Sequence, residues 1–525
     1  MKNFNEIKYH LLYVLVLILS ISSSYAEPVK IQDKTNVIII VADQMRRAGL
    51  GFWSQPEYKG ALNGVSDPVF TPNLDQLAAE GVVFNQAISN YPLCSPFRAM
   101  LMSGMYPNKN GVEQNTHRGR LAGLKPEIKT LTNVLFEQGY NTALFGKAHW
   151  HVNKPLFDQQ GNYQGTENAP GGHYIQQTDF DTYIPPGQSR HGIEYWFQNL
   201  SHVHKNPLIY SNDPATVAGK KDGQVHTNGI YSAVGQADRI IEYLKNNRQQ
   251  RDGAKPFSIL WTMDPPHGPY ESLDDTDEQI YDTYYKGKPI IKLLNRPNVD
   301  VKTAEKFVRY HFSMITLIDR EIGRVLTTLK SQGLEGNTIV IFTADHGEMM
   351  GSHGKMSKNI VQEESLSIPF ILKYPSKLPH RIDDLMFGIP DVMPTLLGLL
   401  KLGDKTPDNI DGVDYSALLL DLKSTNVNRP ISSLYYGKEG ELGVRTAQYT
   451  YALNKSGQLF ALYDNVKDPY QVSNLKLKDI PKKDRVLLIT ELACWLQSID
   501  HPSASLPSLN SNVSLFPINE IDCHR

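Results

Sequence analysis

Cysteine is scarce in this chain of 525 residues, which contains only Cys94, Cys494 and Cys523. So few cysteines exclude a fold held together by many disulfides, the arrangement that small secreted domains use. Cys494 and Cys523 both lie in the C-terminal tail and are expected to form a disulfide if the chain folds under oxidising conditions. Cys94 then has no partner, and an unpaired cysteine in an oxidising compartment calls for another explanation.

An excess of charge of one sign is also lacking. The chain has 53 Lys and Arg residues against 55 Asp and Glu residues, which gives a formal net charge of −2 and a sequence pI of about 6.8. This balance excludes the global positive field of a nucleic-acid-binding protein or of a protein that binds membrane surfaces through charge. Any anion that the protein binds must therefore be held by a local cluster of basic side chains.

A hydrophobic run of membrane-spanning length is missing from the N-terminus. The apolar run there covers only residues 11–19, which is too short to span a bilayer comfortably. It follows Lys2 and Lys8 and precedes small residues that end at Ala26, an order typical of a secretory signal peptide. Residues 1–26 are therefore predicted to be removed, and the protein to be periplasmic or secreted without a stable membrane anchor. Retention of this segment as an anchor is the alternative.

Short apolar runs alternate with amphipathic stretches along most of the remaining chain. The clearest helical pattern covers residues 304–330, and β-branched runs typical of buried strands cover residues 37–41, 141–145, 257–261, 338–343 and 369–372. Strands separated by helices require right-handed crossovers. The predicted fold class is therefore α/β, with a large, mostly parallel sheet flanked by helices on both faces.

The pattern changes near residue 424. Short alternating segments at residues 435–436, 449–451 and 459–463 predict a small antiparallel sheet, and a helix is expected over residues 483–498. We therefore expect a large α/β domain over residues 27–423 and a C-terminal subdomain over residues 424–525. Residues 150–225 are expected to form long loops in which a substrate cleft could be built.

Polar residues follow four of the predicted strands. Because ligands bind beyond the carboxyl ends of the strands in an open parallel sheet, these residues are expected to share one site. They are Asp43-Gln44, Gly146-Lys147-Ala148-His149, Asp264-Pro265-Pro266-His267 and Asp345-His346-Gly347-Glu348.

Three of these side chains offer the hard oxygen ligands that Ca²⁺ and Mg²⁺ prefer, namely Asp43, Gln44 and Asp345. Two aspartates that merely cap separate loops are the alternative interpretation. His346 is a softer ligand, so it either coordinates the cation directly or lies just outside the ligands. Lys147 could bind an anionic group, as could Lys358 further along the chain.

One segment carries a specific motif. Residues 92–104 read PLCSPFRAMLMSG, in which Cys94 and Arg98 form a C-x-P-x-R pattern. This segment resembles the sulfatase signature. In that family the cysteine is oxidised after translation to formylglycine, an aldehyde whose hydrate is the nucleophile, which implies a maturation enzyme as a partner. The resemblance also explains why Cys94 is unpaired.

The resemblance to sulfatases extends along nearly the whole mature chain. It includes residues 139–149 (GYNTALFGKAH), residues 343–348 (TADHGE), Lys358, and the tail segments at residues 462–464, 468–470 and 474–475. By position it implies that Arg98 holds the nucleophile and that Lys147 and Lys358 bind sulfate oxygens. It further implies that His267 protonates the leaving group and that His149 accepts a proton when sulfate is released. The implied ligands of one Ca²⁺, with Mg²⁺ less favoured, are Asp43, Gln44, Cys94, Asp345 and His346.

Three positions depart from the family pattern. Phe97 and Phe145 are larger than the usual residues, but the C-x-P-x-R core is intact. Gln44 replaces the second aspartate of the commonest metal motif, as it does in relatives that hydrolyse phosphonate monoesters and phosphodiesters. Hydrolysis of those esters is therefore one alternative function. An inactive carbohydrate-binding relative is another, disfavoured because every catalytic position carries a competent residue.

The expected substrate is a sulfated carbohydrate. Export and the long loops at residues 150–225 favour an extracellular sulfated sugar over a small cytosolic ester. Tyr174, Tyr195 and Trp196 lie in this region. Each could stack on a sugar face or pack in the core, and the core is the commoner place for any one of them.

Overall fold

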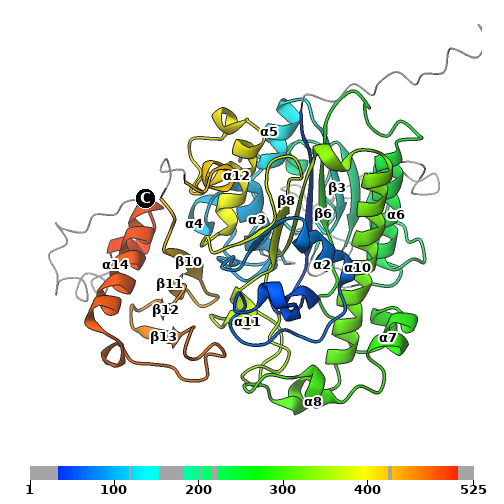
Figure 1. The fold of residues 1–525 in the computed structure, drawn as a ribbon. Coiled ribbons are helices and arrows are strands. Elements are labelled where there is room, and N and C mark those ends of the chain that lie inside the picture. Colours follow the sequence, from blue (N-terminus) through cyan, green and yellow to red (C-terminus); the bar gives the residue numbers. More distant parts are fainter. Residues whose placement is uncertain are drawn as a thin grey trace, which may run out of the picture. The chain divides into compact units, whose positions relative to one another are not determined.

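All five predicted strands belong to one nine-stranded sheet in the computed structural model (Figure 1). The structure describes residues 34–117, 120–152, 181–200, 203–213, 215, 221–423 and 428–505. The predicted signal peptide, Tyr174 and Cys523 lie outside these residues. Cys494 is disulfide-bonded, while its predicted partner falls outside the described part of the chain.

The strand order of the large sheet is β5-β4-β3-β6-β1-β7-β8-β2-β9. The five neighbours from β4 to β7 are mutually parallel, whereas β5 is antiparallel to β4, and β8 is antiparallel to both β7 and β2. This confirms the predicted α/β fold with a mostly parallel sheet. The strands are β1 (Asn36–Ala42), β2 (Val82–Phe84), β3 (Asn141–Gly146), β4 (Tyr195–Asn199), β5 (Ile209–Ser211), β6 (Phe257–Thr262), β7 (Thr338–Ala344), β8 (Phe370–Lys373) and β9 (Arg381–Asp383).

Helices cover both faces of this sheet (Figure 1). One layer contains α2 (Pro72–Ala79), α6 (Ser232–Lys245) and α10 (Val308–Ser331), and the other contains α3 (Cys94–Ser103), α5 (Leu131–Glu137) and α12 (Val392–Leu399). Every residue of β1 is buried between the two layers, which explains its uninterrupted apolar sequence. The shorter helices are α4 (Pro107–Asn110), α7 (Glu278–Tyr284), α8 (Ile290–Leu293), α9 (Val301–Ala304), α11 (Glu363–Leu366) and α13 (Ser416–Leu420).

The structure corrects two expectations about the large domain, on the loops and on a helix, and it decides between the two alternatives for Tyr195 and Trp196. Part of the predicted loop region, residues 150–225, forms β4 and β5 and extends the sheet. Tyr195 and Trp196 lie in β4 with exposed fractions of 7% and 0%, so they pack in the core and cannot stack on a sugar. The predicted helix at 304–330 begins only at Val308, because Phe307 is its N-cap and a separate short helix, α9, precedes it.

A second sheet lies near the C-terminus, as predicted. Its strands β10 (Ser432–Tyr436), β11 (Leu442–Thr446), β12 (Tyr449–Leu453) and β13 (Leu459–Asp464) pair in sequence order and are all antiparallel. Helix α14 (Lys482–Ser498) packs against β10 and β11. Within the described ranges, no helix combines the length and the apolarity needed to cross a membrane.

An ion pair between buried Arg445 and half-buried Glu363 joins the small sheet to the large domain. Arg445 on β11 donates through Nε to Glu363 Oε1 (2.7 Å) and through Nη2 to Glu363 Oε2 (3.0 Å). Its third nitrogen donates to Gln86 Oε1 at 2.6 Å. Although burial opposes ionisation of Glu363, Arg445 and Arg47 lower the pKa of this carboxyl to about 2.

The Glu363 ion pair predicts a specific loss of acid stability. Since the carboxyl has a folded pKa of about 2 and an unfolded pKa near 4.3, its contribution is complete above about pH 4.5 and is lost as the pH falls toward 2. Glu363→Gln should lower the free energy of unfolding at pH 7 by about 3 to 5 kcal/mol, because it leaves Arg445 buried without its partner charge. The difference from the wild type should shrink in acid, as measured by urea unfolding across this pH range.

The exposed pair of Glu439 with Lys438 provides the control for this test. Glu439→Gln should leave the unfolding curves almost unchanged at every pH. A Glu363→Gln protein as stable as the wild type at pH 7 would contradict the proposed role of the ion pair.

Candidate active site

The register of the sheet brings the predicted polar residues together. Ala42 pairs with Ala344 across β1 and β7, so the residues that follow them, Asp43 and Asp345, leave the sheet side by side. Gly146 pairs with Thr262 across β3 and β6, which brings Lys147 close to Asp264 (Nζ to Oδ1, 3.3 Å). Because β3, β6, β1 and β7 are consecutive neighbours, their carboxyl ends form one continuous polar edge.

Helix α3 supplies the motif residues from the other side of the site. Cys94 is its first residue, and Arg98 follows one turn later on the same helical face. The helix N-terminus adds partial positive charge at Cys94. Every residue of α3 is buried, including Phe97, whose side chain belongs to the hydrophobic core. The large residue inside the motif is therefore accommodated by packing.

Two glycines permit the close approach of loops at this edge. Gly146 has a φ of 107°, and a Cβ atom there would lie 2.0 Å from the carbonyl oxygen of Thr262. A Cβ atom at Gly347 would lie 1.8 Å from the carbonyl oxygen of Glu364. Any larger residue would displace Lys147 in the first case and the Asp345-His346 segment in the second.

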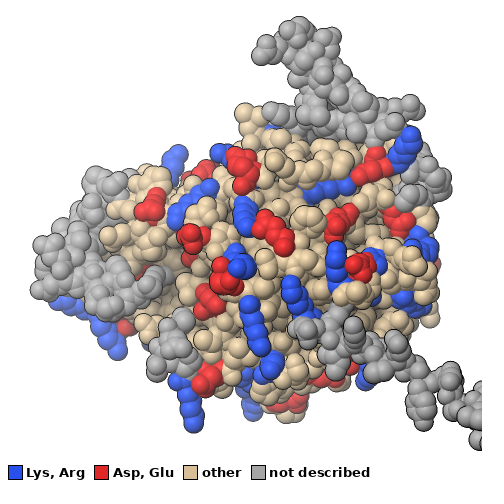
Figure 2. Space-filling model, turned by 90° about the horizontal axis from the view of Figure 1, so that it is seen from above, with Lys and Arg blue, Asp and Glu red and all other residues tan. Residues whose placement is uncertain are grey.

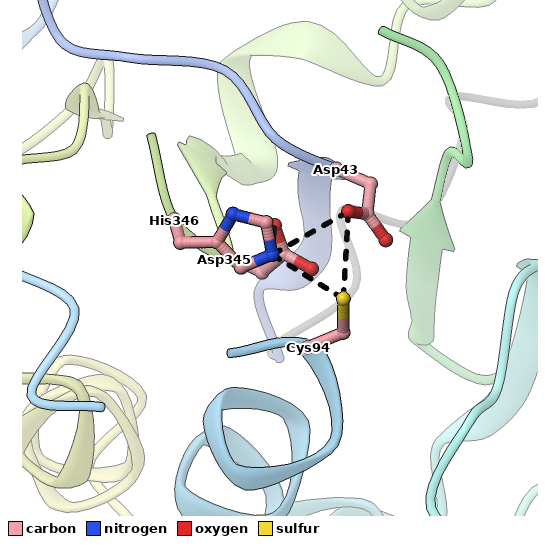
Figure 3. A group of neighbouring side chains, drawn as sticks. All are labelled: Asp43, Cys94, Asp345 and His346. Carbon is pink, nitrogen blue, oxygen red and sulfur yellow. Dashed lines mark hydrogen bonds and ion pairs between the residues drawn. The ribbon is translucent and has the colours of Figure 1, made fainter. Parts of the chain in front are cut away.

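Four side chains converge at the centre of the site (Figure 3). His346 Nε2 lies 3.3 Å from Cys94 Sγ, 3.4 Å from Asp345 Oδ1 and 3.6 Å from Asp43 Oδ1. Cys94 Sγ lies 3.7 Å from Asp43 Oδ1. All four residues are buried, and one ligand atom from each lies within 4.8 Å of the others.

This cluster fits a divalent cation. Asp345 Oδ2 accepts no hydrogen bond from any described residue, although it is buried. Burial and the neighbouring carboxylate of Asp43 raise the pKa of Asp345 to about 7. Two buried carboxylates this close repel each other, and a cation between them would remove this repulsion. His346 Nδ1 donates to the Gly347 carbonyl (3.0 Å), so Nε2 is the ring nitrogen that faces the cluster. The sequence alone did not decide whether His346 lies among the ligands, and this geometry favours that position.

Asp43 also contacts the buried cations of the site. Its Oδ2 accepts from Lys147 Nζ at 2.6 Å and from Arg98 Nη2 at 3.2 Å. Burial alone would raise the pKa of Asp43, but Lys147, with weaker effects from His267, Lys358 and Arg98, holds it well below the usual value. Lys147 is fully buried, and its carboxylate neighbours raise its pKa, so its ammonium group stays charged.

The half-buried residues Lys358 and His267 lie together at the site. Lys358 Nζ donates to Gln44 Oε1 at 2.6 Å and also to His267 Nε2. His267 Nδ1 donates to the Gly268 carbonyl at 2.7 Å. The Gln44 side chain thus contacts Lys358, while its backbone N–H donates to Asp345 Oδ1 at 2.9 Å.

His149 is poised as a neutral base. Its Nε2 donates to the Thr116 carbonyl at 3.2 Å, and its buried Nδ1 has no hydrogen-bond partner among the described residues. Burial and the nearby Lys147 lower its pKa to about 4, so the imidazole is uncharged near neutral pH. Among the predicted catalytic residues, Cys94 thus belongs to the cluster, Arg98 and Lys147 contact Asp43, and Lys358 contacts Gln44 and His267. His149 follows Lys147 by two residues in the chain.

Three supporting residues had no assigned role in the sequence analysis. Asp264 accepts from Lys147 and lies 3.4 Å from His204, whose Nε2 donates to the His267 carbonyl at 2.7 Å. Glu348 accepts from the side chains of Gln44 and Tyr270. Asp264 and Glu348 stood in the polar segments after the strands, but no sequence signal pointed to His204.

Comparisons with known proteins agree with this site. Residues 35–402 match the family model described as sulfatase, and residues 351–493 match the one described as N-sulphoglucosamine sulphohydrolase, C-terminal. The chain is 39% identical over 497 residues to an endo-4-O-sulfatase of Bacteroides thetaiotaomicron, covering 90% of this chain and 93% of the relative. It is 31% identical to a Formosa agariphila ulvan-active sulfatase, covering 84% and 77%.

A solved structure shows the same fold. It comes from work on the metabolism of multiple glycosaminoglycans by Bacteroides thetaiotaomicron. Its TM-score is 0.82 at 37% sequence identity, and the match covers 92% of this chain and 100% of the solved one.

The cation cluster predicts that calcium stabilises the folded protein. Ca²⁺ should raise the thermal unfolding midpoint of the wild type, because it binds only the folded state. Asp345→Asn should abolish this shift while leaving the metal-free midpoint unchanged or higher, since it removes the repulsion between two buried carboxyls. Asp319→Asn changes a buried aspartate outside the cluster and should keep the calcium shift. A calcium shift that survives in Asp345→Asn would contradict the site.

Proposed function

The chain belongs to the sulfatase family and is a sulfuric ester hydrolase, and we propose that it cleaves sulfate esters of carbohydrates with a formylglycine made from Cys94. The observation that carries this proposal is the position of Cys94. Its side chain lies at a helix N-terminus within 3.7 Å of Asp43 and 3.3 Å of His346. A thiol needs no such surroundings for packing, whereas a nucleophile beside a cation does.

We propose that Asp43, Asp345, His346 and the residue formed from Cys94 hold one divalent cation, with Gln44 as a further oxygen ligand. Oxygen-rich donors favour Ca²⁺ over transition metals. When bound, the cation supplies charge neutralisation at the sulfate and lowers the pKa of the attacking hydroxyl. The aldehyde supplies a hydrated carbon that can expel sulfate without waiting for an external water.

Three buried or half-buried cations surround the position where the sulfate group would lie. Arg98 donates to the Lys147 carbonyl at 2.7 Å and to Asp43, which fixes its guanidinium beside the nucleophile. Lys147 and Lys358 are then the groups that bind sulfate oxygens. Burial and the carboxylate of Asp43 raise the pKa of the Cys94 thiol, but Lys358, Lys147 and His346 outweigh them and lower it to about 6, so these surroundings favour an anion.

The two histidines divide the proton transfers. His267 Nε2 accepts from Lys358 at the half-buried side of the site, where a substrate would enter. Once Nε2 carries a proton, the imidazolium can pass it to the departing alcohol oxygen. His149 is neutral and its Nδ1 has no hydrogen-bond partner among the described residues, so it accepts a proton when sulfate is released.

Sulfated carbohydrates are the proposed substrates because the endo-4-O-sulfatase and the ulvan-active sulfatase resemble this chain over most of its length. The visible face in Figure 2 carries Lys, Arg, Asp and Glu side chains intermixed, so a sulfated chain would be recognised through local contacts. Screening sulfated oligosaccharides together with aryl phosphodiesters tests this specificity. Faster turnover of the phosphodiesters would contradict it.

We also propose that the protein is exported, on the evidence of its N-terminal segment. Lys2 and Lys8, the apolar run at residues 11–19 and the small residues up to Ala26 support this. An N-terminal peptide that still contains residues 1–26 in protein from the periplasm or medium would contradict cleavage.

Peptide mass spectrometry tests the nucleophile. Protein produced with a formylglycine-generating enzyme should yield a peptide around Cys94 that is lighter by the change from thiol to aldehyde. The matched control is the same chain produced without that enzyme, which should keep the thiol and lack turnover, as should Cys94→Ala. Normal turnover by the unconverted protein would show that another group attacks the sulfate.

Leaving-group dependence should separate the two histidines. His267→Ala should lose about a hundred- to ten-thousand-fold on sugar sulfates, whose alkoxides need protonation, and much less on an activated aryl sulfate. His149→Ala should slow sulfate release for both substrates and show a burst of aryl alcohol followed by a stall. Equal losses on both substrates for both variants, without a burst, would contradict this division.

A further inference from the structure

A buried carboxylate behind the cation cluster contacts three separate segments of the chain. Glu348 is fully buried. Its Oε1 accepts from the backbone N–H groups of Met350 (2.8 Å) and Ser357 (2.7 Å). Its Oε2 accepts from the side-chain amide of Gln44 and from the hydroxyl of Tyr270 (3.2 Å). Both carboxylate oxygens of Glu348 therefore accept hydrogen bonds, one from two backbone N–H groups and the other from an amide and a hydroxyl.

The contact with Glu348 determines which way the Gln44 amide points. A carboxylate has only acceptors, so the NH₂ group of Gln44 must face it. The carbonyl oxygen Oε1 is then turned to the opposite side, where Lys358 Nζ donates to it at 2.6 Å. Without Glu348, the amide could turn over and present its NH₂ group to Lys358 and to the cation.

Glu348 also fixes the backbone beside Lys358. The flanking residues Ser357 and Asn359 have φ values of 70° and 68°, in the left-handed region that these residues adopt at a cost. Glu348 Oε1 accepts from the N–H of Ser357, and the hydroxyl oxygen of Ser365 accepts from the N–H of Asn359 at 3.0 Å. The segment on both sides of Lys358 is thus held in this conformation by buried acceptors.

We propose that Glu348 is a positioning residue that makes Gln44 an oxygen donor to the cation and keeps Lys358 in place. This inference rests on the proposed function. It also explains how a neutral glutamine can serve beside a divalent cation. The negative charge that Gln44 lacks is supplied by Glu348, on the far side of the same amide.

Glu348→Gln tests the proposal, because a glutamine has only one acceptor oxygen. If its NH₂ group faces the backbone N–H groups, the segment beside Lys358 must shift. If it faces Gln44, that amide must turn over and direct its own NH₂ group at the cation. In both cases the dissociation constant for Ca²⁺, measured by calorimetry, should rise about ten- to a hundred-fold.

Two further variants separate positioning from folding. Tyr270→Phe removes one donor to the same Glu348 oxygen and should leave calcium affinity unchanged. The double variant that combines Gln44→Glu with Glu348→Gln restores matched donors and acceptors. The carboxylate at position 44 can accept from the new amide at position 348 and still face the cation with its other oxygen. It should recover most of the lost affinity, even if Glu348→Gln alone folds poorly.

The outcomes distinguish this inference from the proposed function. Calcium affinity of Glu348→Gln equal to the wild type, or no recovery in the exchange variant, would overturn the role of Glu348 alone. A wild type that binds no calcium would overturn the proposed cation. The role of Glu348 can then still be tested without a cation. Lys358 is acetylated in the presence of a chelator, and the rate is followed by peptide mass spectrometry. The lysine should react faster in Glu348→Gln than in Tyr270→Phe. Equal rates would overturn the inference.

Discussion

The carboxylate of Asp43 is the charge on which the arrangement of the site depends. It lies at the end of the central strand β1, fully buried, and accepts from Lys147 and Arg98. A buried ammonium or guanidinium group costs several kcal/mol unless a nearby carboxylate compensates it. Asp43 therefore stabilises the buried charges of Lys147 and Arg98 before an anionic substrate binds. Because Asp43 is also a cation ligand in the proposed function, cation binding and the release of Lys147 toward the sulfate are linked through one side chain.

The surrounding fold holds the charged side chains of the site in fixed positions. The parallel register of β1 and β7 places Asp43 beside Asp345, and the buried helix α3 places Cys94 and Arg98 against them. Beyond these residues lies a layer of groups that touch no reacting atom, such as Asp264 and Glu348. A site with several like charges in close contact is stable only when each is oriented by such neighbours.

The sequence predicted the central strands, and it predicted that the polar residues after them lie close together, because both depend on local patterns. A few adjacent residues are enough to recognise the β-branched run at residues 37–41 and the C-x-P-x-R spacing of Cys94 and Arg98. Strands β4 and β5 were expected to be loops, since their short, mixed sequences acquire strand structure only by pairing, β4 with β3 and β5 with β4. The partners of Glu348 could not be predicted, because Gln44 lies 304 positions away in the chain and only the folded sheet brings the two together.

The ion pair of Arg445 with Glu363 bears on how such proteins can diversify. Glu363 begins the short helix α11, and Ser365 in that helix fixes the backbone next to Lys358. The C-terminal sheet is therefore joined to the segment that carries Lys358, although its strands supply none of the site residues. A recombination event, or a chimaera made in the laboratory, could exchange this sheet only if the incoming one carried an arginine at the position of Arg445. We therefore expect the C-terminal sheet and the large domain to be inherited together as one unit.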